Sequence, residues 1–482
     1  MFEHSPRQIA TALLAAGILS GCSLAPQYVR PQAPIATAYP SNGYGQPAGA
    51  PQSAGAGETA SAITLGWRQY FPDPQLQALI ADALENNRDL RSSALNIQEA
   101  RALYNIQSAD RLPNINAVAA GSRAPTSGNN ISTSYQVGLS LASFELDFFG
   151  RVRNLSEAAL NEYLATEEAR QAVQISLVAQ VAQAYLAERA FAEQLTLAQS
   201  TLDGRQTTYQ LSQKRFEVGA TSALDLRLNE TLVQSARISL ATLARQRAQA
   251  ENALTLLVGK PLADNPAGPT LSEQNLVTDI PAGLPSDLLT RRPDIRAAEL
   301  RLKAANANIG AARAAFFPRI SLTAGIGTVS DELSGLFKAG SRAWTFAPQL
   351  VLPIFDAGRN RGNLNLAEVR KDLAVAAYEK SIQTAFREVA DALVARGSLD
   401  EQIDAQQAFL DATAERLKLA DLRYQSGVAS SLDLLDAQRD LFSAQQALVQ
   451  TRLLRLTNAI DLYRALGGGL NESTSVALNG SP

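Results

Sequence analysis

The sequence has 482 residues, enough for two or three ordinary domains, and its net charge is only −3. This balanced charge gives no indication of a nucleic-acid partner or of a strongly charged substrate. No apolar run reaches the roughly 18 residues that a membrane-spanning helix needs, so we expect no helical transmembrane anchor.

The rarest residues are confined to the start of the chain. The single Met, His and Cys are Met1, His4 and Cys22. Zinc sites and nucleophile–base pairs usually recruit His or Cys, and the sequence contains no glycine-rich phosphate loop. Carboxylate pairs such as Glu167 and Glu168 lie on a strongly helical segment, where a solvated helix surface is the more usual role. We therefore expect no enzyme activity and no metal site.

The N-terminus has the pattern of a secretory signal. Residues 9–21 form an apolar core that is too short to span a membrane. The letters LSGC at residues 19–22 look like the lipoprotein box, in which cleavage leaves a lipidated N-terminal cysteine. We predict a signal peptide over residues 1–21, a covalent lipid on Cys22 and no other cofactor; a chance cysteine after an ordinary signal is the alternative. By resemblance to such lipoproteins, Ser23 in the next position favours the outer membrane.

The remainder of the chain divides into two similar halves. RLPNI at 111–115 matches FFPRI at 316–320 at an offset of 205 (316 − 111), and DFFGRVRN at 147–154 matches FDAGRNRG at 355–362 at an offset of 208 (355 − 147). These matches indicate an internal duplication. The predicted parts are a lipidated tether at 22–61, a first repeat at 62–258, a linker at 259–285, a second repeat at 286–470 and a polar tail at 471–482.

In each repeat, strand-like sequence lies between the proline of the first matching string (RLPNI or FFPRI) and the Gly-Arg pair of the second (DFFGRVRN or FDAGRNRG). The apolar positions of the three clearest stretches are Tyr135, Val137, Leu139 and Leu141; Ile320, Leu322, Ala324 and Ile326; and Trp344, Phe346, Leu350, Leu352 and Ile354. This period of two predicts β-hairpins at about 114–147 and 319–355 with an apolar face toward lipid. A half-buried sheet in a soluble domain is the alternative, and Pro348 is an objection to the last strand.

Four strands cannot close a barrel, and an open sheet edge cannot lie in lipid. If these strands span a membrane, several chains must contribute to one barrel. The sequence therefore predicts an oligomer.

The other segments are predicted to be very long helices. Residues 151–218 and 363–426 contain no proline and one glycine each; at 1.5 Å per residue, each helix would be on the order of 100 Å long. Strict seven-residue periods in the return segments predict left-handed coiled-coil packing. The repeating positions are Leu435, Phe442, Val449, Leu456 and Tyr463; Leu434, Leu441, Leu448 and Leu462; and Leu226, Val233, Leu240 and Leu254. The last two series are interrupted at the same place by Arg455 and Arg247.

The two predicted helical hairpins turn through nearly the same sequence. RFEVGATSALDLRLNE at 215–230 and RYQSGVASSLDLLDAQRD at 423–440 align at an offset of 208 (423 − 215). Each contains a glycine at the position of a helix C-cap, followed by Ser and Asp at the spacing of a capping box. The predicted caps are Gly219, Ser222 and Asp225 in the first turn and Gly427, Ser430 and Asp433 in the second.

Asp436 stands apart, because its counterpart in the first hairpin is Leu228. Neither the turn nor the heptad period requires an acid at this place. In an oligomer, one Asp per chain would form a ring of like charge, and such a ring can select cations in a pore. An ordinary exposed helix charge is the alternative.

Six longer strings carry a family resemblance that covers essentially all of the chain after Cys22. They are SDLLTRRPDIRAAE, AANANIGAARAAFFPRISLTAG, ELDFFGRVR, LPIFDAGRNR, QTAFREVADAL and LYRALGGG. They resemble the TolC-like outer membrane factors of tripartite efflux pumps, and most closely the OprM-type lipoprotein branch.

The resemblance implies a mixed α/β membrane protein. Each chain of a homotrimer would contribute four strands to a twelve-stranded outer-membrane β-barrel, continued by a long periplasmic α-helical coiled-coil barrel. The implied function is a passive multidrug exit duct, lipid-anchored in the cell outer membrane. The implied partners are a periplasmic adaptor, an inner-membrane RND transporter and outer-membrane lipid, with no nucleic acid.

The resemblance also implies roles for single residues. Cys22 carries the lipid, and Leu432, Asp436 and Arg439 form a periplasmic gate. The adaptor-contacting tips are Val218, Gly219, Ala220, Gly427, Val428 and Ala429. Two other functions stay open: a type I secretion duct shares the fold but has other partners, and a structural envelope-spanning lipoprotein would need no alternating strands.

Overall fold

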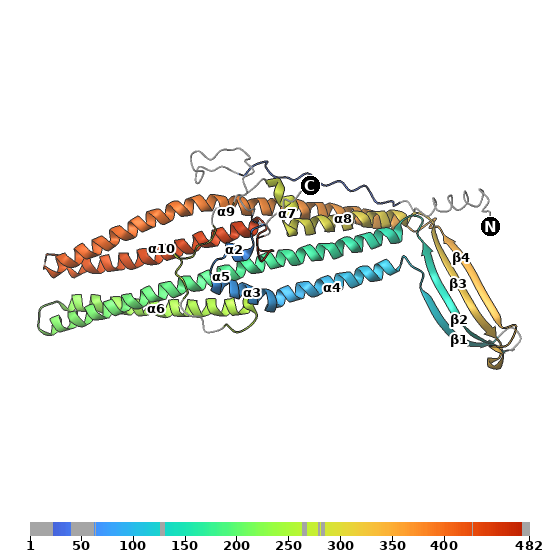
Figure 1. Ribbon diagram of the computed structural model, residues 1–482, viewed down its shortest axis with the longest axis horizontal. Helices are drawn as coiled ribbons and strands as arrows, with labels where there is room; N and C mark the ends of the chain where they lie inside the picture. The colour runs from blue at the N-terminus through green and yellow to red at the C-terminus, as the bar shows by residue number, and fades with distance from the viewer. Residues whose placement is uncertain are drawn as a thin grey trace, which may run out of the picture. The chain divides into compact units, whose positions relative to one another are not determined.

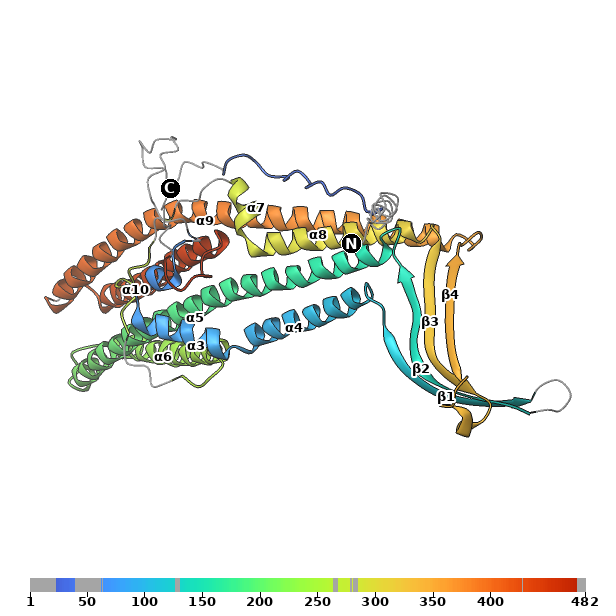
Figure 2. The ribbon, with the colours of Figure 1, turned by 45° about the vertical axis from the view of Figure 1, so that its right-hand side comes forward.

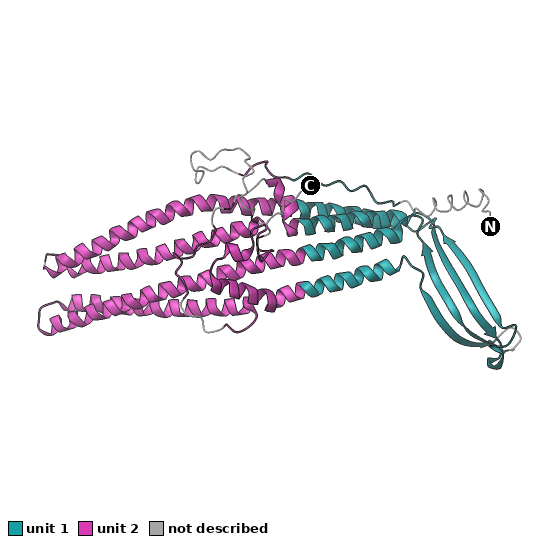
Figure 3. Cartoon of the chain, viewed as in Figure 1, with its two compact units in different colours: residues 1–33, 94–168, 296–381 teal, residues 34–93, 169–295, 382–482 magenta. Residues whose placement is uncertain are grey.

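The computed structural model describes residues 23–39, 62, 64–125, 131–262, 268–277, 280, 285–426 and 428–474 (Figure 1). The chain forms two compact units, shown in Figure 3. The first comprises residues 1–33, 94–168 and 296–381, and the second comprises residues 34–93, 169–295 and 382–482.

The first unit contains one antiparallel sheet of four strands in the order β1-β2-β3-β4, which curve together in Figure 2. The strands are β1 (Ile115–Pro125), β2 (Ile131–Leu146), β3 (Arg319–Ser330) and β4 (Arg342–Val351). All four strands expected from the alternating sequence are present. Because β1 and β4 each pair on one side only within the described chain, the sheet has two open edges.

The strand register collects the apolar residues on one face. Leu139 of β2 is opposite Ile326 of β3, which is opposite Trp344 of β4. Their exposed fractions are 53%, 57% and 75%. Cross-strand partners point to the same side of a sheet, so this apolar face is uncovered in the protomer.

A β-bulge explains where the period of two breaks. The register of β2 against β3 shifts between Leu141 and Phe144, and Ser143 has a positive φ of 52°. The extra residue reverses the alternation. Phe144 and Leu146 therefore share the apolar face with the odd-numbered residues before the bulge, although their numbers are even.

Pro348 does not disrupt the sheet. It lies opposite Leu322 in β4, an edge strand, and an edge is where a missing backbone N–H is tolerated.

Helices make up the remainder, and two of them are very long. The helices are α2 (Trp67–Tyr70), α3 (Pro74–Asn86), α4 (Arg88–Ala109), α5 (Arg151–Glu217), α6 (Ala223–Val258), α7 (Leu288–Arg291), α8 (Pro293–Ala314), α9 (Arg359–Gln425) and α10 (Ser431–Ala465), with 3₁₀ turns η1 (Pro285–Asp287) and η2 (Leu333–Gly335). α5 and α9 have 67 residues each, which corresponds to a length of about 100 Å. Among the described residues, no helix is both long and apolar enough to cross a membrane.

The helices pack through the positions that the sequence period indicates. In the second unit, Leu435, Val449 and Leu456 of α10 are buried. The arginines that interrupt the heptads reach carboxylates on the neighbouring long helices: Arg247 pairs with Glu188 of α5 at 2.9 Å. Arg455 makes the corresponding pair with Asp400 of α9.

Residues 65–70 pack against the end of α10 and the segment after it in the second unit. The rings of Tyr70 and Tyr463 stack with centroids 3.9 Å apart, and Tyr463 Oη donates to the Leu65 carbonyl at 2.7 Å. The backbone N–H of Trp67, at the start of α2, donates to the Asn471 carbonyl at 2.9 Å.

Candidate functional site: the tips of the helical hairpins

The chain turns twice between long helices in the second unit, from α5 into α6 and from α9 into α10 (Figures 1 and 2). In the first turn Gly219 has a φ of 71°, and Ala220 N donates to the Arg215 carbonyl at 2.7 Å. This closes α5 with a left-handed glycine. In the second turn Val428 N donates to the Arg423 carbonyl at 2.9 Å; Gly427 lies outside the described residues.

Both return helices begin with a capping box. Ser222 Oγ accepts from Asp225 N at 3.0 Å, and the Asp225 carboxylate accepts from Ser222 N at 3.4 Å. Ser430 and Asp433 exchange the same two bonds at 3.4 and 3.3 Å. These bonds satisfy the backbone donors at the helix starts.

Two contacts join one hairpin to the other. Ser431 Oγ, at the start of α10, donates to the Asp225 carboxylate of the first hairpin. Arg215 Nη1 donates to Tyr424 Oη at 3.4 Å, with the guanidinium 5.8 Å from the ring centroid. The hydroxyls of Ser222 and then Ser431 hold the pKa of Asp225 below its ordinary value. Sequence spacing gave no signal for either contact, because both depend on how the two hairpins lie side by side.

The predicted gate residues lie on the first three turns of α10. Arg439 Nη2 is 3.2 Å from Asp436 Oδ1, and Arg439 Nε is 3.7 Å from Asp440 Oδ1. Asp440 in turn pairs with Arg416 of α9 at 2.7 Å. Acidic and basic groups therefore alternate from the α10 surface to α9. Leu432, one turn before Asp436, is 52% exposed.

The tips are apolar as well as exposed. Val218 is 78% exposed, Leu224 is 70% exposed and Val428 is 71% exposed. Ala220 is also exposed, whereas Ala429 is half-buried. Exposed apolar residues gathered at a turn are typical of a protein contact surface.

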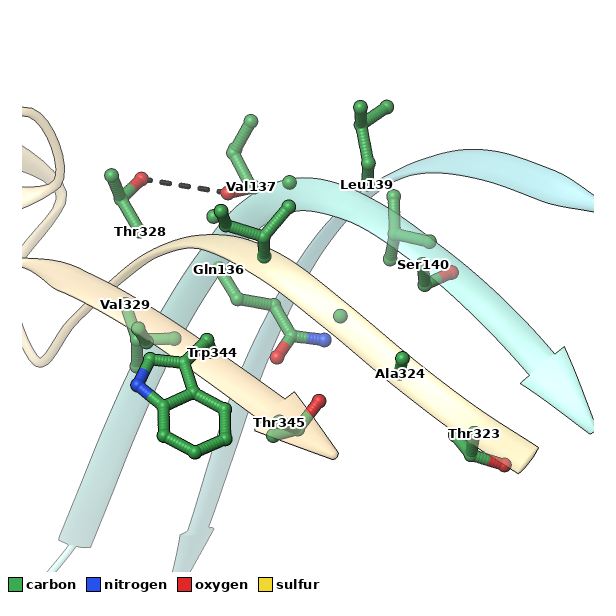
Figure 4. Close-up of a pocket in the computed structure, with 16 residues that line it drawn as sticks. Gln136, Val137, Leu139, Ser140, Thr323, Ala324, Thr328, Val329, Trp344 and Thr345 are labelled. Carbon is green, nitrogen blue, oxygen red and sulfur yellow. Dashed lines mark hydrogen bonds between the residues drawn. The ribbon is translucent and has the colours of Figure 1, made fainter. Parts of the chain in front are cut away.

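The other predicted or possible sites give less evidence of a function. Cys22 lies outside the described residues. No group of three or more His, Cys, Asp or Glu within the described ranges is placed to hold a metal ion. A hollow of about 280 Å³ on the sheet (Figure 4) is lined by no charged residue and includes Gly138, Gly325 and Gly327.

Most of the chain matches one family of proteins. A model of the family described as outer membrane efflux protein matches residues 79–260 and 284–468. The outer membrane protein OprJ of Pseudomonas aeruginosa is 49% identical over 479 residues, covering 97% of each chain. The toluene efflux pump outer membrane protein TtgC of Pseudomonas putida is 46% identical, covering 98% of this chain and 97% of its own.

Solved structures give the same result. The open state of the Neisseria gonorrhoeae MtrE outer membrane channel superposes with a TM-score of 0.85 at 46% identity, covering 94% of this chain and all of that one. CusC superposes with a TM-score of 0.83 at 44% identity, covering 93% and 100%.

Proposed function

Because this chain belongs to the outer membrane efflux protein family, we propose that it is the exit duct of a tripartite RND-type multidrug efflux system. The chain is an outer-membrane transport component, with the fold of the trimeric efflux channels. The duct would be passive and would carry out no catalysis. Relatives named for toluene, solvent and antibiotic efflux support small apolar and amphiphilic molecules as its cargo.

The observation that carries the proposal is the sheet, with its uncovered apolar face and two open edges. Such edges cannot remain unpaired in lipid. Pairing β4 of one copy with β1 of the next satisfies them, and three copies of four strands make a closed barrel of twelve.

The gate is proposed at the start of α10, next to the turn that follows α9. Leu432, Asp436 and Arg439 would face the duct at its periplasmic end. The bonds Ser431–Asp225 and Arg215–Tyr424 support a closed resting arrangement, because separating the hairpins breaks both. The tips that would contact the adaptor, and through it the inner-membrane transporter, are Val218, Gly219, Ala220, Gly427, Val428 and Ala429.

Lipidation is a separate part of the proposal. Cleavage of residues 1–21 would leave Cys22 as the first residue, with a covalent lipid holding the protein to the outer membrane. The LSGC letters support this, and the mature chain would carry no other cofactor.

The test is to measure efflux in cells of the source organism that lack the gene for this chain. Accumulation of a fluorescent pump substrate should rise several-fold, and re-expression of the wild-type chain should restore efflux. Unchanged accumulation together with unchanged sensitivity to solvents and antibiotics would overturn the proposal. Metabolic labelling with palmitate, compared between wild type and Cys22→Ser, tests lipidation separately.

A further inference from the structure

Arg205 is a buried cation in α5 that has no acidic partner. The residue is 6% exposed, and its Nη1 donates to the Leu232 carbonyl of α6 at 3.1 Å. Its Nε is buried without a hydrogen-bond partner, and no carboxylate among the described residues pairs with the guanidinium. Burial lowers the pKa of Arg205 below its ordinary value, but arginine stays protonated in proteins. A positive charge therefore lies between the helices.

Helix packing does not require a charge at this place. The equivalent position in the second repeat is Thr413 (205 + 208), which is also 6% exposed and donates to the Leu410 carbonyl of its own helix. An unpaired buried charge is costly, and an apolar side chain of similar volume often packs more favourably. Arg205 is therefore better explained by a second contact than by the stability of the first hairpin.

That second contact joins the two hairpins. The Arg205 guanidinium lies 5.7 Å from the ring centroid of Phe442 in α10. The equivalent of Phe442 in the first hairpin is Gln234 (442 − 208), so each hairpin supplies a different member of the pair. Leu202 and Tyr209, one turn to either side of Arg205 on α5, belong to an apolar cluster with α6. The cation thus meets the ring in desolvated surroundings, where this attraction is strongest.

The contact differs in kind from those at the tips. It lies ten residues from Arg215 along α5 (215 − 205), or about 15 Å. The Ser431–Asp225 contact is a hydrogen bond, which depends on a narrow range of distance and angle, and the Arg215–Tyr424 pair is only partly buried. A desolvated cation is attracted over the whole ring face within about 6 Å of the centroid. The Arg205 contact therefore tolerates rotation of one hairpin against the other.

We propose that Arg205 is a positioning residue for the periplasmic gate: through Phe442 it holds α10 at a pivot about which the tips separate. The inference rests on the proposed gate at the start of α10. The bond to the Leu232 carbonyl fixes the guanidinium to α6, so the first hairpin carries the pivot and the Phe442 ring can turn against it. Opening begins at the tips and stops at the pivot. Without the cation, the hairpins would part along more of their length.

The test is hydrogen exchange of the full-length trimer in detergent, in an Asp225→Ala background that loosens the tips. With Arg205 present, residues 430–434 should exchange fast while residues 438–446 stay protected. Adding Arg205→Met should raise the exchange rate at 438–446 by about tenfold or more, because the Phe442 ring loses its cation. Arg205→Lys, which keeps a cation, should restore most of the protection.

Two further variants control this experiment. Arg245→Met is the matched control, because Arg245 is exposed on α6 and donates to Gln249 of its own helix at 3.4 Å; it should exchange like its background. Phe442→Leu should match Arg205→Met, and the two together should do no more than either alone, since both remove the same contact. Arg205→Met should not lower the melting temperature of the trimer, because it removes an unpaired buried charge.

The outcomes separate a pivot from a purely structural role. Unchanged protection at 438–446 in Arg205→Met, additive effects of Arg205→Met and Phe442→Leu, or faster exchange confined to α6 near Leu232 would each overturn the pivot. Exchange does not depend on transport, so these results would leave the efflux function intact. In a planar bilayer, Arg205→Met alone should raise the opening frequency several-fold. Faster exchange in α10 without more frequent opening would overturn the role of Arg205 in the gate.

Discussion

Asp225 and Asp433 hold equivalent places in the two hairpins, but their surroundings differ. Each closes a capping box with its own serine. Asp225 also accepts from Ser431 of the other hairpin. The position equivalent to Ser431 in the first hairpin is Ala223 (431 − 208), which has no hydroxyl, so the reciprocal bond cannot form. The contact between the tips is therefore one-sided within a protomer.

We expect Asp225→Ala to loosen the tips more than Asp433→Ala does. Each loses a cap worth about 1 kcal/mol, and Asp225→Ala also loses a partly buried hydrogen bond from the other hairpin, worth about 1 kcal/mol. Hydrogen exchange measures this at residues 222–226 and 430–434. Only Asp225→Ala should speed exchange in both segments; equal and purely local effects would contradict the asymmetry.

The same carboxylate predicts a pH dependence. The pKa of Asp225 is below its ordinary value of 3.8 because the charged form is hydrogen-bonded in the folded state. A lowered folded pKa contributes stability that is fully present above the unfolded pKa and is lost as pH falls through the folded one. The protection of the tip amides, measured against the intrinsic exchange rate at each pH, should therefore be insensitive to this group between pH 7 and 5 and should fall below about pH 4. In Asp225→Ala that acid-dependent loss of protection should be reduced.

Local spacing was sufficient for some of these residues. The Ser222–Asp225 and Ser430–Asp433 boxes, and the Asp436–Arg439 pair three residues apart on a helix, are contacts that spacing alone can predict. The Ser431–Asp225 bond was not predictable, because it depends on the side-by-side placement of two hairpins some 200 residues apart in sequence.

At the scale of elements, the four strands follow from alternation, but the bulge in β2 was missed. In an uninterrupted alternation, one residue separates an apolar residue from the next one on the same face, but two residues separate Leu141 from Phe144. This extra residue is the only signal for the bulge in the sequence. The pairing between strands could not be predicted from the alternation either. Gly138 and Gly327 face each other across β2 and β3, and this pairing explains why both are glycine.

Substituting these glycines should damage the sheet. A Cβ atom on Gly138 would clash with the Ile326 carbonyl, and one on Gly327 with the Val137 carbonyl. Overpacking costs about 1–3 kcal/mol, and backbone cannot move aside as a side chain can, so we expect Gly138→Ala and Gly327→Ala at the upper end. The assay is survival of the folded trimer on heating in detergent. In Gly325→Ala the added Cβ atom would meet the Thr345 hydroxyl at 2.9 Å, which can move, so this variant should be destabilised less. Equal loss of heat resistance in all three variants would argue against the backbone clash.

Replacing two glycines of the first hairpin with alanine should change the stability of the protein in opposite directions. Gly204 lies inside α5 with nothing within 4 Å of an added Cβ, so Gly204→Ala should stabilise the helix by about 0.5–1 kcal/mol. Gly219 has equally open surroundings but a φ of 71°, so Gly219→Ala should destabilise the turn by about 1 kcal/mol. Thermal unfolding of both variants compares them; a shift in the same direction would contradict the left-handed turn.

In the whole molecule, the sequence repeat, the alternating strands and the long helical segments predicted an oligomeric barrel with long coiled-coil helices. The family resemblance implied the trimeric channel fold, which the structure and its relatives confirm. The oligomer followed from a physical constraint, since four strands leave edges that lipid does not tolerate. The packing of residues 23–30 against α8 was missed, because these residues belong to a segment whose Pro-, Ala- and Gly-rich composition is typical of a poorly packed tether. Its contacts come from α5 and α8, which no local pattern connects with it.

In the proposed duct, the periplasmic end is closed around Asp436. Ion conductance of the purified trimer in a planar lipid bilayer tests it directly, for wild type, Asp436→Ala and the control Glu230→Ala. Glu230 is paired with Arg227 at 2.6 Å across three residues, much as Asp436 is paired with Arg439. We predict small or rare openings in wild type and in Glu230→Ala, and larger or more frequent ones in Asp436→Ala. Equal, sizeable conductance in all three would contradict a gate at Asp436.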